Sequence, residues 1–546
     1  MGDGLRGVGG GLVVAGDLVM EEQLHLLIGL GRDPGTGEPL GRAYPVYRAA
    51  ADRVQDGPGE NGRDVMQAVA ASAVNQPNEK RRHAVAAYDF TFSIPKSASI
   101  LWGVGDPATK ERIAAARHAA VAEVIADMER EVAATRTGTT APGGAVAQVD
   151  VTGLIATAFD HFDSRAGDPH LHTHVVISNK VQTVLDGKWR SLDGRPMHEA
   201  VAALSELHEA LFADALTRSL GVQWEKRERG RDRHPAWAIS FVPQMLVAEF
   251  SSRSRHIDVE TDRLIEAYLA SHGRRPNPVT IMKLRAQATL ATRPVKQVHS
   301  LADLTAAWRE RASRVLGQDF STLAGEEASS VVLLRAEHLP REAIAALGLR
   351  VMTAVSEKRA TWRHWNLTAE AARQTILYRF ASASDREAVI SWIVDAAERA
   401  SLRLTPPGLA MSPVAFHRED ETSVFRPKHS AVFTSTELLD AESRLLERAD
   451  DERGRRVATA TGHASARTKL PGGGVLADDQ FAALVCIVGS GRVVDVHVGP
   501  ADADMTTAMS VLRRVWEEAH GAGSGVGLAP VAAALLGSRN VGTFPP

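Results

Sequence analysis

The chain has 546 residues, of which 44% are hydrophobic and 24% are charged. This length exceeds what a single core usually supports, so we expect two to four domains, and the composition excludes a wholly disordered, collagen-like or mucin-like protein. The formal charge is −3, from 63 basic and 66 acidic residues, so any surface for nucleic acid would have to be a local patch.

The chain contains one cysteine, Cys486, which cannot form an internal disulfide. No basic stretch followed by a long apolar run predicts a secretion signal or a membrane span. These features predict a cytoplasmic protein without membrane insertion.

The first predicted elements are a short helix at 21–30 and a strand at 85–93. In the strand, aromatic side chains alternate with polar ones, which indicates that one face is buried. Asp89 lies on the polar face. Its carboxylate could orient a metal ligand or accept a proton, although a single such residue is more often a hydrogen-bonding group at a strand edge.

Helical and extended patterns alternate in the next part of the chain. A helix is predicted at 107–134, followed by two strands at 148–162 and 171–182 that flank a polar turn at 163–169. A hairpin turn at 186–188 then precedes a second long helix at 196–220. Asp106 directly precedes the first of these helices and is a plausible cap.

Two basic segments follow, at 226–233 and 274–296. Each is either a solvated face or a surface that contacts phosphates. Beyond them, residues 300–374 have a helical pattern, and 405–433 have short strands interrupted by proline.

The strongest chemical signal is a group of four histidines within residues 161–174. Side chains alternate between the two faces of a strand, so His172 and His174 point the same way and can share a metal ion. The preceding turn can bring His161 beside them. Three neutral imidazoles leave open positions on a divalent cation, which a catalytic metal needs in order to take substrate oxygens. The alternatives are ordinary half-buried strand histidines or a structural metal site.

Two motifs resemble those of a known family. Residues 161–179 and the strand motif at 88–97 are similar to the metal-site and upstream strand motifs of the MobF-type conjugative relaxases, the TrwC/TraI-like HUH endonucleases. The resemblance continues at 187–190 and 250–254. It implies an α+β fold in which an antiparallel, palm-like sheet is flanked by helices.

This resemblance also implies a chemistry. In the family, the sheet binds single-stranded DNA at a transfer origin, and three histidines hold a divalent cation that polarises the scissile phosphate. A tyrosine attacks this phosphate and stays linked to the 5′ end, while the released 3′ hydroxyl permits religation. The matching ligands would be His161, His172 and His174, and Asp89 would be the acidic partner near the nucleophile.

Loops beside the proposed site carry Lys96 and Arg165, which are candidate phosphate contacts, with simple surface solvation as the alternative. The metal would be magnesium, manganese or zinc. Imidazole binds transition metals more tightly, but the availability of each ion can decide which one occupies the site. The expected partners are single-stranded DNA of a plasmid or integrative-element transfer origin and the conjugation coupling machinery.

The tyrosines depart from the family pattern. The family's nucleophiles lie on an N-terminal segment ahead of the region that resembles 2–19, whereas the tyrosines here are at 44, 47, 88, 268 and 378. Tyr44 and Tyr47 could be recruited, but their sequence context suggests a loop. We therefore expect that the chain begins downstream of a natural start or derives from a truncated gene, and that covalent transfer is impaired.

Residues 475–530 resemble the start of the RecD-like superfamily 1 helicase domain that follows the relaxase in this family. A phosphate-binding loop there would include Gly499, Asp504, Met505 and Thr506. Asp504 and Met505 replace the second glycine and the lysine of a working loop. A carboxylate repels a triphosphate and methionine supplies no positive charge, so no functional ATP site is expected.

Four segments are predicted. Residues 1–295 are predicted to be a relaxase domain without its tyrosine segment, and 296–450 a helical or mixed connecting region. A linker at 451–474 precedes a truncated, degenerate RecD-like helicase part at 475–546.

Three functions are compatible with these patterns. The leading hypothesis is metal-dependent, site- and strand-specific nicking and transesterification of single-stranded DNA, impaired by the missing tyrosine. The second is a remnant that binds metal and single-stranded DNA without cutting. The third is an unrelated three-histidine metallohydrolase.

Overall fold

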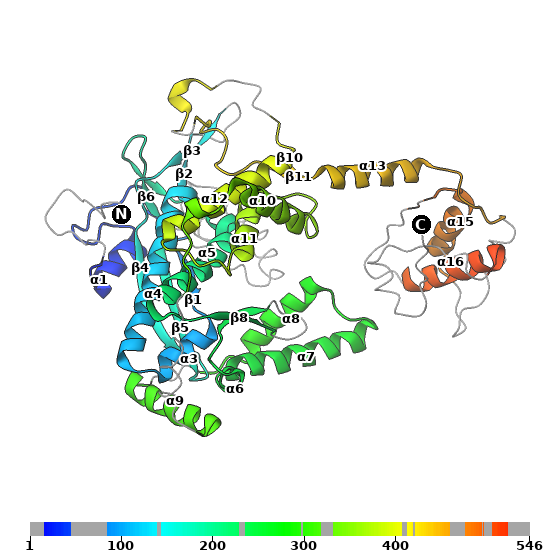
Figure 1. Cartoon of the computed structure of the whole chain (residues 1–546). Helices are drawn as coiled ribbons and strands as arrows, with labels where there is room; N and C mark the ends of the chain where they lie inside the picture. Colours follow the sequence, from blue (N-terminus) through cyan, green and yellow to red (C-terminus); the bar gives the residue numbers. More distant parts are fainter. Residues whose placement is uncertain are drawn as a thin grey trace, which may run out of the picture. The chain divides into compact units, whose positions relative to one another are not determined.

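The structure is a computed structural model that describes residues 16–44, 84–138, 144–228, 235–295, 299–317, 331–406, 412–418, 421–458, 476–493, 495 and 505–521. The chain divides into two compact units (Figure 1). The first unit consists of Met1–Arg255 and Pro294–Phe433, and the second of His256–Arg293 and Thr434–Pro546.

A three-stranded antiparallel sheet lies within the first unit (Figure 1). Its middle strand, β5 (Pro169–Ser178), pairs with β1 (Ala87–Ser93) on one side and with β4 (Ala156–Asp163) on the other. Alternate residues of β5 are buried, including Leu171 and Ile177, because one face of the sheet packs against helices. The antiparallel sheet flanked by helices confirms the predicted α+β fold class.

The first predicted strand run is interrupted. Residues 148–162 were expected to be continuous, but β3 (Val146–Asp150) and β4 are separate strands. Between them, the Leu154 backbone N–H donates to the Glu129 carboxylate at 2.8 Å, so this segment pairs with a helix side chain and not with a neighbouring strand.

The second run, 171–182, also divides. Asn179 separates β5 from β6 (Lys180–Gln182). Its side-chain amide donates to the Val85 carbonyl at 2.6 Å, and its backbone N–H donates to the Ala86 carbonyl. These bonds fix the end of β5 to the segment that enters β1.

Two long helices, α4 (Pro107–Asp127) and α5 (Gly194–Leu220), pack against each other beside the sheet (Figure 1). The predicted cap is confirmed, because the Asp106 carboxylate accepts the Thr109 backbone N–H at 3.0 Å. The helix that was expected to reach residue 134 is shorter. It ends in a π-helical turn, Met128–Val132, before the chain enters the next strand.

Three two-stranded hairpins also belong to the first unit. They are β2 (Ala134–Gly138) with β3, β6 with β7 (Trp189–Ser191), and β8 (Trp224–Arg227) with β9 (Ala236–Ile239). The hairpin turn predicted at 186–188 is confirmed, since it joins β6 to β7. The first two hairpins lie side by side, because Thr135 bridges to Leu192 and its hydroxyl donates to the Ser191 carbonyl at 2.6 Å.

The short helix α9 (Leu301–Leu316) supports the turn between β4 and β5. Trp308 is 1% exposed, and its indole N–H donates to the Gly167 carbonyl at 2.7 Å. The same helix packs against α3 (Lys96–Val104), and Arg309 donates to the Gly105 carbonyl at its end. This packing fixes the turn that precedes the first histidines of β5.

Helices α10 (Arg341–Ser356), α11 (His364–Gln374) and α12 (Ala383–Ala400) pack together, and α11 also packs against α5. Within the described residues, α9, α10 and α11 confirm the helical pattern predicted for 300–374, whereas α12 lies beyond it. Arg386 of α12 and Asp214 of α5 form a two-pronged ion pair with distances of 2.5 and 2.9 Å, and both residues are 0% exposed. This pair joins the helical layer to the helix that covers the sheet.

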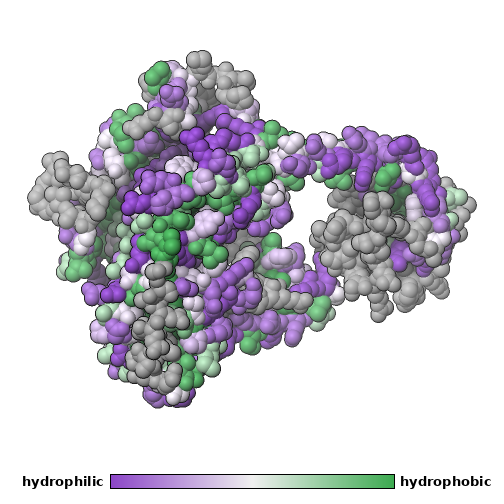
Figure 2. All heavy atoms as spheres, viewed as in Figure 1, coloured by the Kyte–Doolittle hydropathy of each residue, from purple (hydrophilic) through white to green (hydrophobic). Residues whose placement is uncertain are grey.

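Helices dominate the second unit. They comprise α8 (Pro278–Ala291), α13 (Thr436–Asp450), α15 (Asp478–Ser490), α16 (Met505–His520) and most of α7 (Ser252–His272). Figure 2 shows α13 as a largely hydrophilic helix, and none of its residues is buried. Helices α15 and α16 share a small core that includes Leu484, Val488, Val511 and Val515.

The predicted helicase part at 475–546 lies partly within the described residues. Two helices are present where they were expected, and Met505 and Thr506 begin the second of them. Gly499 and Asp504, which were predicted to belong to a degenerate phosphate loop, lie outside the described residues. Across the described residues, every helix is too short or too polar to cross a lipid bilayer.

Asp127 at the end of α4 gives a pH-dependent prediction. Its side chain is 16% exposed, and burial raises its pKa to about 6. The folded-state pKa exceeds the unfolded-state value, so ionised Asp127 lowers the free energy of unfolding. This destabilisation is absent below the unfolded-state pKa, grows as the pH rises from there, and is complete above the folded-state pKa. Asp127→Asn should therefore raise the free energy of unfolding by about 1–3 kcal/mol at neutral pH and change it little in acid. Urea denaturation at both pH values checks this, and equal effects in the two would contradict it.

Candidate metal centre

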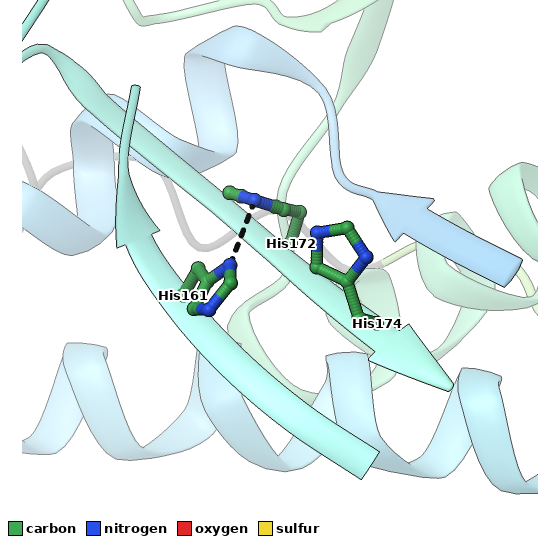
Figure 3. A group of neighbouring side chains, drawn as sticks. All are labelled: His161, His172 and His174. Atoms are coloured by element: carbon green, nitrogen blue, oxygen red, sulfur yellow. Dashed lines mark hydrogen bonds between the residues drawn. The ribbon is translucent and has the colours of Figure 1, made fainter. Parts of the chain in front are cut away.

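Three histidines converge on one face of the central sheet (Figure 3). His161 on β4 lies directly opposite His172 on β5, and His174 follows on the same face of β5. The ring centroids are 5.0, 5.1 and 5.3 Å apart, and one nitrogen from each ring lies within 4.8 Å of the others. The juxtaposition expected from strand spacing is therefore present. Among the described residues it is the only such group of three potential metal ligands.

Hydrogen bonds fix two of these rings in the orientation that a metal ligand needs. His174 Nδ1 donates to Asp89 Oδ1 at 2.9 Å, because an ionised carboxylate can only accept. His172 Nδ1 donates to the His170 carbonyl at 2.9 Å. Both imidazoles thus keep Nε2 as the nitrogen with a lone pair, as in metal sites whose outer partners orient the ligands.

The spacing of the nitrogens also fits one cation. His161 Nδ1 and His172 Nε2 lie 3.3 Å apart. Two ligand nitrogens at about 2.0–2.1 Å from a tetrahedral cation are separated by roughly 3.3 Å. This pair therefore has the separation that two ligands of a single ion require.

The protonation of the cluster favours metal binding. Burial lowers the pKa of His172, and positive charge on His161 or His174 lowers it further. Burial also lowers the pKa of His170 to about 4. Neutral imidazole is the form that binds a cation, so His172 can bind without losing a proton at neutral pH.

Two side chains beside the histidines are partly exposed in the described part of the structure. Phe159, opposite His174 on β4, is 37% exposed, and the Asp89 side chain is 55% exposed. Helices α4 and α5 contact the opposite face, where Phe92 packs against His208 with ring centroids 5.1 Å apart. Helices therefore cover one face of the sheet, and the three histidines lie on the other face.

Asp160 stabilises the pairing of the two strands that carry the histidines. Asp160 and Thr173 are cross-strand partners on the covered face, and the Thr173 hydroxyl donates to Asp160 at 2.8 Å. Arg117 of α4, whose side chain is 3% exposed, donates to the same carboxylate at 2.7 Å. Neither Asp160 nor Arg117 was predicted from the sequence. Strand alternation places Asp160 on the covered face, but nothing local identifies its partner on a distant helix.

Asp168 anchors the turn between β4 and β5. It is 1% exposed and accepts the Ser252 backbone N–H at the start of α7 at 2.8 Å. Arg311 of α9 donates to the same carboxylate at 3.1 Å. A carboxylate at a helix N-terminus is favourable, so Asp168 links the turn to two helices. Its position in a polar turn was the only sequence signal for this role.

The two predicted phosphate contacts differ in availability. The Lys96 ammonium donates to the Pro169 carbonyl at 2.6 Å, and burial lowers its pKa to about 8. Arg165 is exposed on the turn and makes no hydrogen bond or ion pair with the described residues. Arg165 is therefore the freer cation, and Lys96 is tied to the start of β5.

Tyr44 lies away from the histidine cluster. The Tyr44 hydroxyl donates to the Ala86 carbonyl at 3.1 Å, and burial raises its pKa. Ala86 is five residues before Thr91, the partner of His174, which corresponds to ~17 Å along an extended strand. Tyr44 is thus not placed to attack a phosphate at the cluster. Tyr47 lies outside the described residues.

The Asp89–His174 hydrogen bond leads to a further prediction. Asp89→Asn should lower the affinity for a divalent cation by about 10- to 100-fold, because an amide can present its N–H to the ring and no longer fixes the tautomer. Titration calorimetry with zinc or manganese measures this. Asp163→Asn, on the same strand as His161 but not bonded to His174, is the control and should bind normally. Unchanged affinity in Asp89→Asn would contradict the orienting role.

Comparison with known proteins gives a consistent result. The family model for the TrwC relaxase matches residues 1–315. Two relatives are the multifunctional conjugation protein TraI of Escherichia coli, which is 29% identical over 230 residues, and TraI of Escherichia coli strain K12, 29% identical over 227 residues. In both cases the match covers 40% of this chain and only 12% of the relative.

Solved structures of the conjugative relaxase TrwC with oriT DNA are also similar. The metal-free complex has a TM-score of 0.40 and 24% identity, and the match covers 56% of this chain and 88% of that chain. The copper-bound complex has the same TM-score and identity, with 56% and 85% covered.

Proposed function

The chain belongs to the TrwC relaxase family, whose model matches residues 1–315 of the 546, and from this we propose that it binds single-stranded DNA at a metal centre formed by His161, His172 and His174 and nicks it there. The observation that carries the proposal is the convergence of three imidazoles on one face of a sheet. The proposed substrate is a plasmid or integrative-element transfer origin, because the similar TrwC structures contain oriT DNA.

The chemistry follows from the charge of the substrate. A phosphodiester is anionic and resists attack by an oxygen nucleophile. When bound at the three histidines, magnesium, manganese or zinc would supply a Lewis acid that withdraws charge from the oxygens of the scissile phosphate. Asp89 keeps the proton of His174 on Nδ1, and the His170 carbonyl does the same for His172.

Other residues on this face would position the DNA. Arg165 is exposed on the adjoining turn and would contact a phosphate. Phe159 is 37% exposed beside His174 and is suited to stacking on a base. We assign Lys96 a supporting role, because its ammonium is bound to the Pro169 carbonyl.

Nicking requires a tyrosine at the scissile phosphate. In that step a bond forms between the tyrosine oxygen and phosphorus while the bond from phosphorus to the 3′ oxygen breaks, so the DNA leaves with a 3′ hydroxyl and its 5′ phosphate stays on the protein. Tyr44 is bonded to Ala86 away from the cluster, which favours a second candidate function: binding of metal and single-stranded DNA without cleavage.

One experiment separates these functions. The full chain is incubated with manganese and single-stranded DNA from a candidate transfer origin, and the products are resolved on a denaturing gel and by mass spectrometry. A 5′-linked protein adduct, absent in His172→Ala, supports nicking, and peptide mapping identifies the tyrosine. Binding without an adduct supports the second candidate. Two free DNA ends would instead indicate hydrolysis and contradict a relaxase mechanism.

The wider assignments are also proposals. The relaxase part is proposed to be residues 1–295, and 475–546 to be a degenerate helicase start that does not hydrolyse ATP. The conjugation coupling machinery is a proposed partner, and the cytoplasm is the proposed location.

A further inference from the structure

A second polar site lies in the first unit, in a pocket of about 520 Å³ between the β2–β3 and β6–β7 hairpins. Its lining includes four cationic side chains and one carboxylate: Arg42, Arg136, Lys180 and Arg190, with Asp193. The whole chain has a formal charge of −3, so this is a local concentration of positive charge. A concave site lined by cations attracts an anionic ligand.

Two of these cations remain available to a ligand. Arg190 donates through both Nη groups to Asp186 at 2.6 and 2.8 Å, so it contributes charge and few free donors. Arg136 is 55% exposed and has one contact, at 3.3 Å, with Asp193. The Arg42 guanidinium is exposed and makes no hydrogen bond or ion pair within the described part of the chain.

The pocket is built into the fold. Lys180 is 3% exposed, and its ammonium donates to the Arg42 carbonyl at 2.5 Å and lies 4.6 Å from the centre of the Tyr44 ring. The Thr135 hydroxyl holds the two hairpins together through the Ser191 carbonyl. These bonds hold the walls in place before a ligand arrives, which lowers the entropic cost of binding.

The chemistry of the lining indicates a nucleotide. Free arginines match a phosphate, and Trp189, which also lines the pocket, offers an aromatic surface for a base. We propose that the pocket binds one nucleotide unit of the same single strand whose phosphate lies at the histidine cluster, and this inference rests on the proposed function.

The position of the pocket along the chain sets the length of DNA required. Lys180 follows His174 by six residues, so the two sites are at most ~20 Å apart along an extended strand. A stacked single strand advances about 3.4 Å per nucleotide, so roughly six nucleotides span this distance. An oligonucleotide of this length or longer can therefore reach both sites.

The test measures DNA binding in the absence of metal. A fluorescent twelve-nucleotide oligothymidylate is titrated with the full chain in EDTA at several salt concentrations, using wild type and Arg42→Gln/Arg136→Gln. A nucleotide unit carries one phosphate, so the double variant should reduce the slope of log affinity against log salt by about 0.7. Trp189→Leu should weaken binding by roughly 5- to 150-fold with an unchanged slope.

Arg314→Gln is the matched control, because Arg314 is exposed and paired with Glu310 in the same unit. It should bind like wild type, and thermal melts verify that every variant is folded. Unchanged affinity and slope in the double variant would overturn the inference. So would saturable binding of thymidine monophosphate to wild type that is lost in the double variant while oligonucleotide binding stays normal, since the pocket would then serve free nucleotides.

The two proposals can fail separately. The oligonucleotide assay is run in EDTA, so it measures binding at the pocket without a metal ion at the histidines. Wild type that binds DNA but forms no adduct with manganese contradicts nicking and leaves the pocket assignment intact. A wild-type chain that does not bind the oligonucleotide in EDTA contradicts the pocket assignment and leaves nicking to the adduct experiment.

Discussion

Replacing Asp214 with alanine is expected to lower the free energy of unfolding by about 3–5 kcal/mol. The variant would leave Arg386 without its counter-charge at a site where both residues are 0% exposed. Arg379, 3.7 Å from the same carboxylate, would lose it too. Removing one partner of a buried ion pair costs more than the pair contributes, because the remaining charge has neither water nor a partner. Urea denaturation of the full chain, followed by circular dichroism, measures the loss.

Glu206→Ala is the matched control for this prediction. Glu206 of α5 pairs with Arg373 of α11 at 2.8 Å, but the two side chains are 28% and 43% exposed. Water replaces such a contact readily, so the expected loss is about 0.2–1 kcal/mol. Equal losses for Asp214→Ala and Glu206→Ala would contradict the buried-charge explanation.

His172→Ala is expected to reduce the affinity for divalent cations by more than the ~10- to 100-fold typical of losing an outer-shell partner. His172 is one of three nearly equally spaced rings, with centroid distances of 5.0 Å to His161 and 5.3 Å to His174. Its loss leaves two imidazoles, which hold a cation far more weakly than three. Zinc titration with a competing chelator measures the change.

His170→Ala serves as the control. Its ring packs against that of His172 at 4.8 Å and its backbone carbonyl accepts from His172 Nδ1, but its nitrogens are not among the three that lie within 4.8 Å of one another. Alanine retains this carbonyl, so the variant should bind zinc like wild type. If His170→Ala lost zinc as completely as His172→Ala, the assignment of the three ligands would be wrong.

The parts of the site that depend on one strand were predictable from the sequence. His172 and His174 share a face because side chains alternate along a strand, and the same rule placed Asp89 on a polar face. The turn before β5 made the approach of His161 plausible. These arguments involve short stretches of chain and well-defined geometry, so they did not need knowledge of the tertiary fold.

The supporting contacts were not predictable, because they depend on which distant elements meet. Arg117 reaches Asp160 only because α4 covers that face of the sheet. Arg386 and Asp214 are 172 residues apart. The run at 148–162 had strand propensity throughout, but the Leu154 N–H bonds to Glu129 and tertiary context divides the strand.

The central claim is that three imidazoles share a single cation. X-ray absorption of the zinc-loaded full chain tests it most directly, because scattering from imidazole ligands gives their number and distance. The predicted result is one zinc per chain with three histidine nitrogens at about 2.0–2.1 Å, falling to two in His161→Ala. A zinc environment with fewer than three imidazoles in wild type, or one unchanged in His161→Ala, would contradict the account.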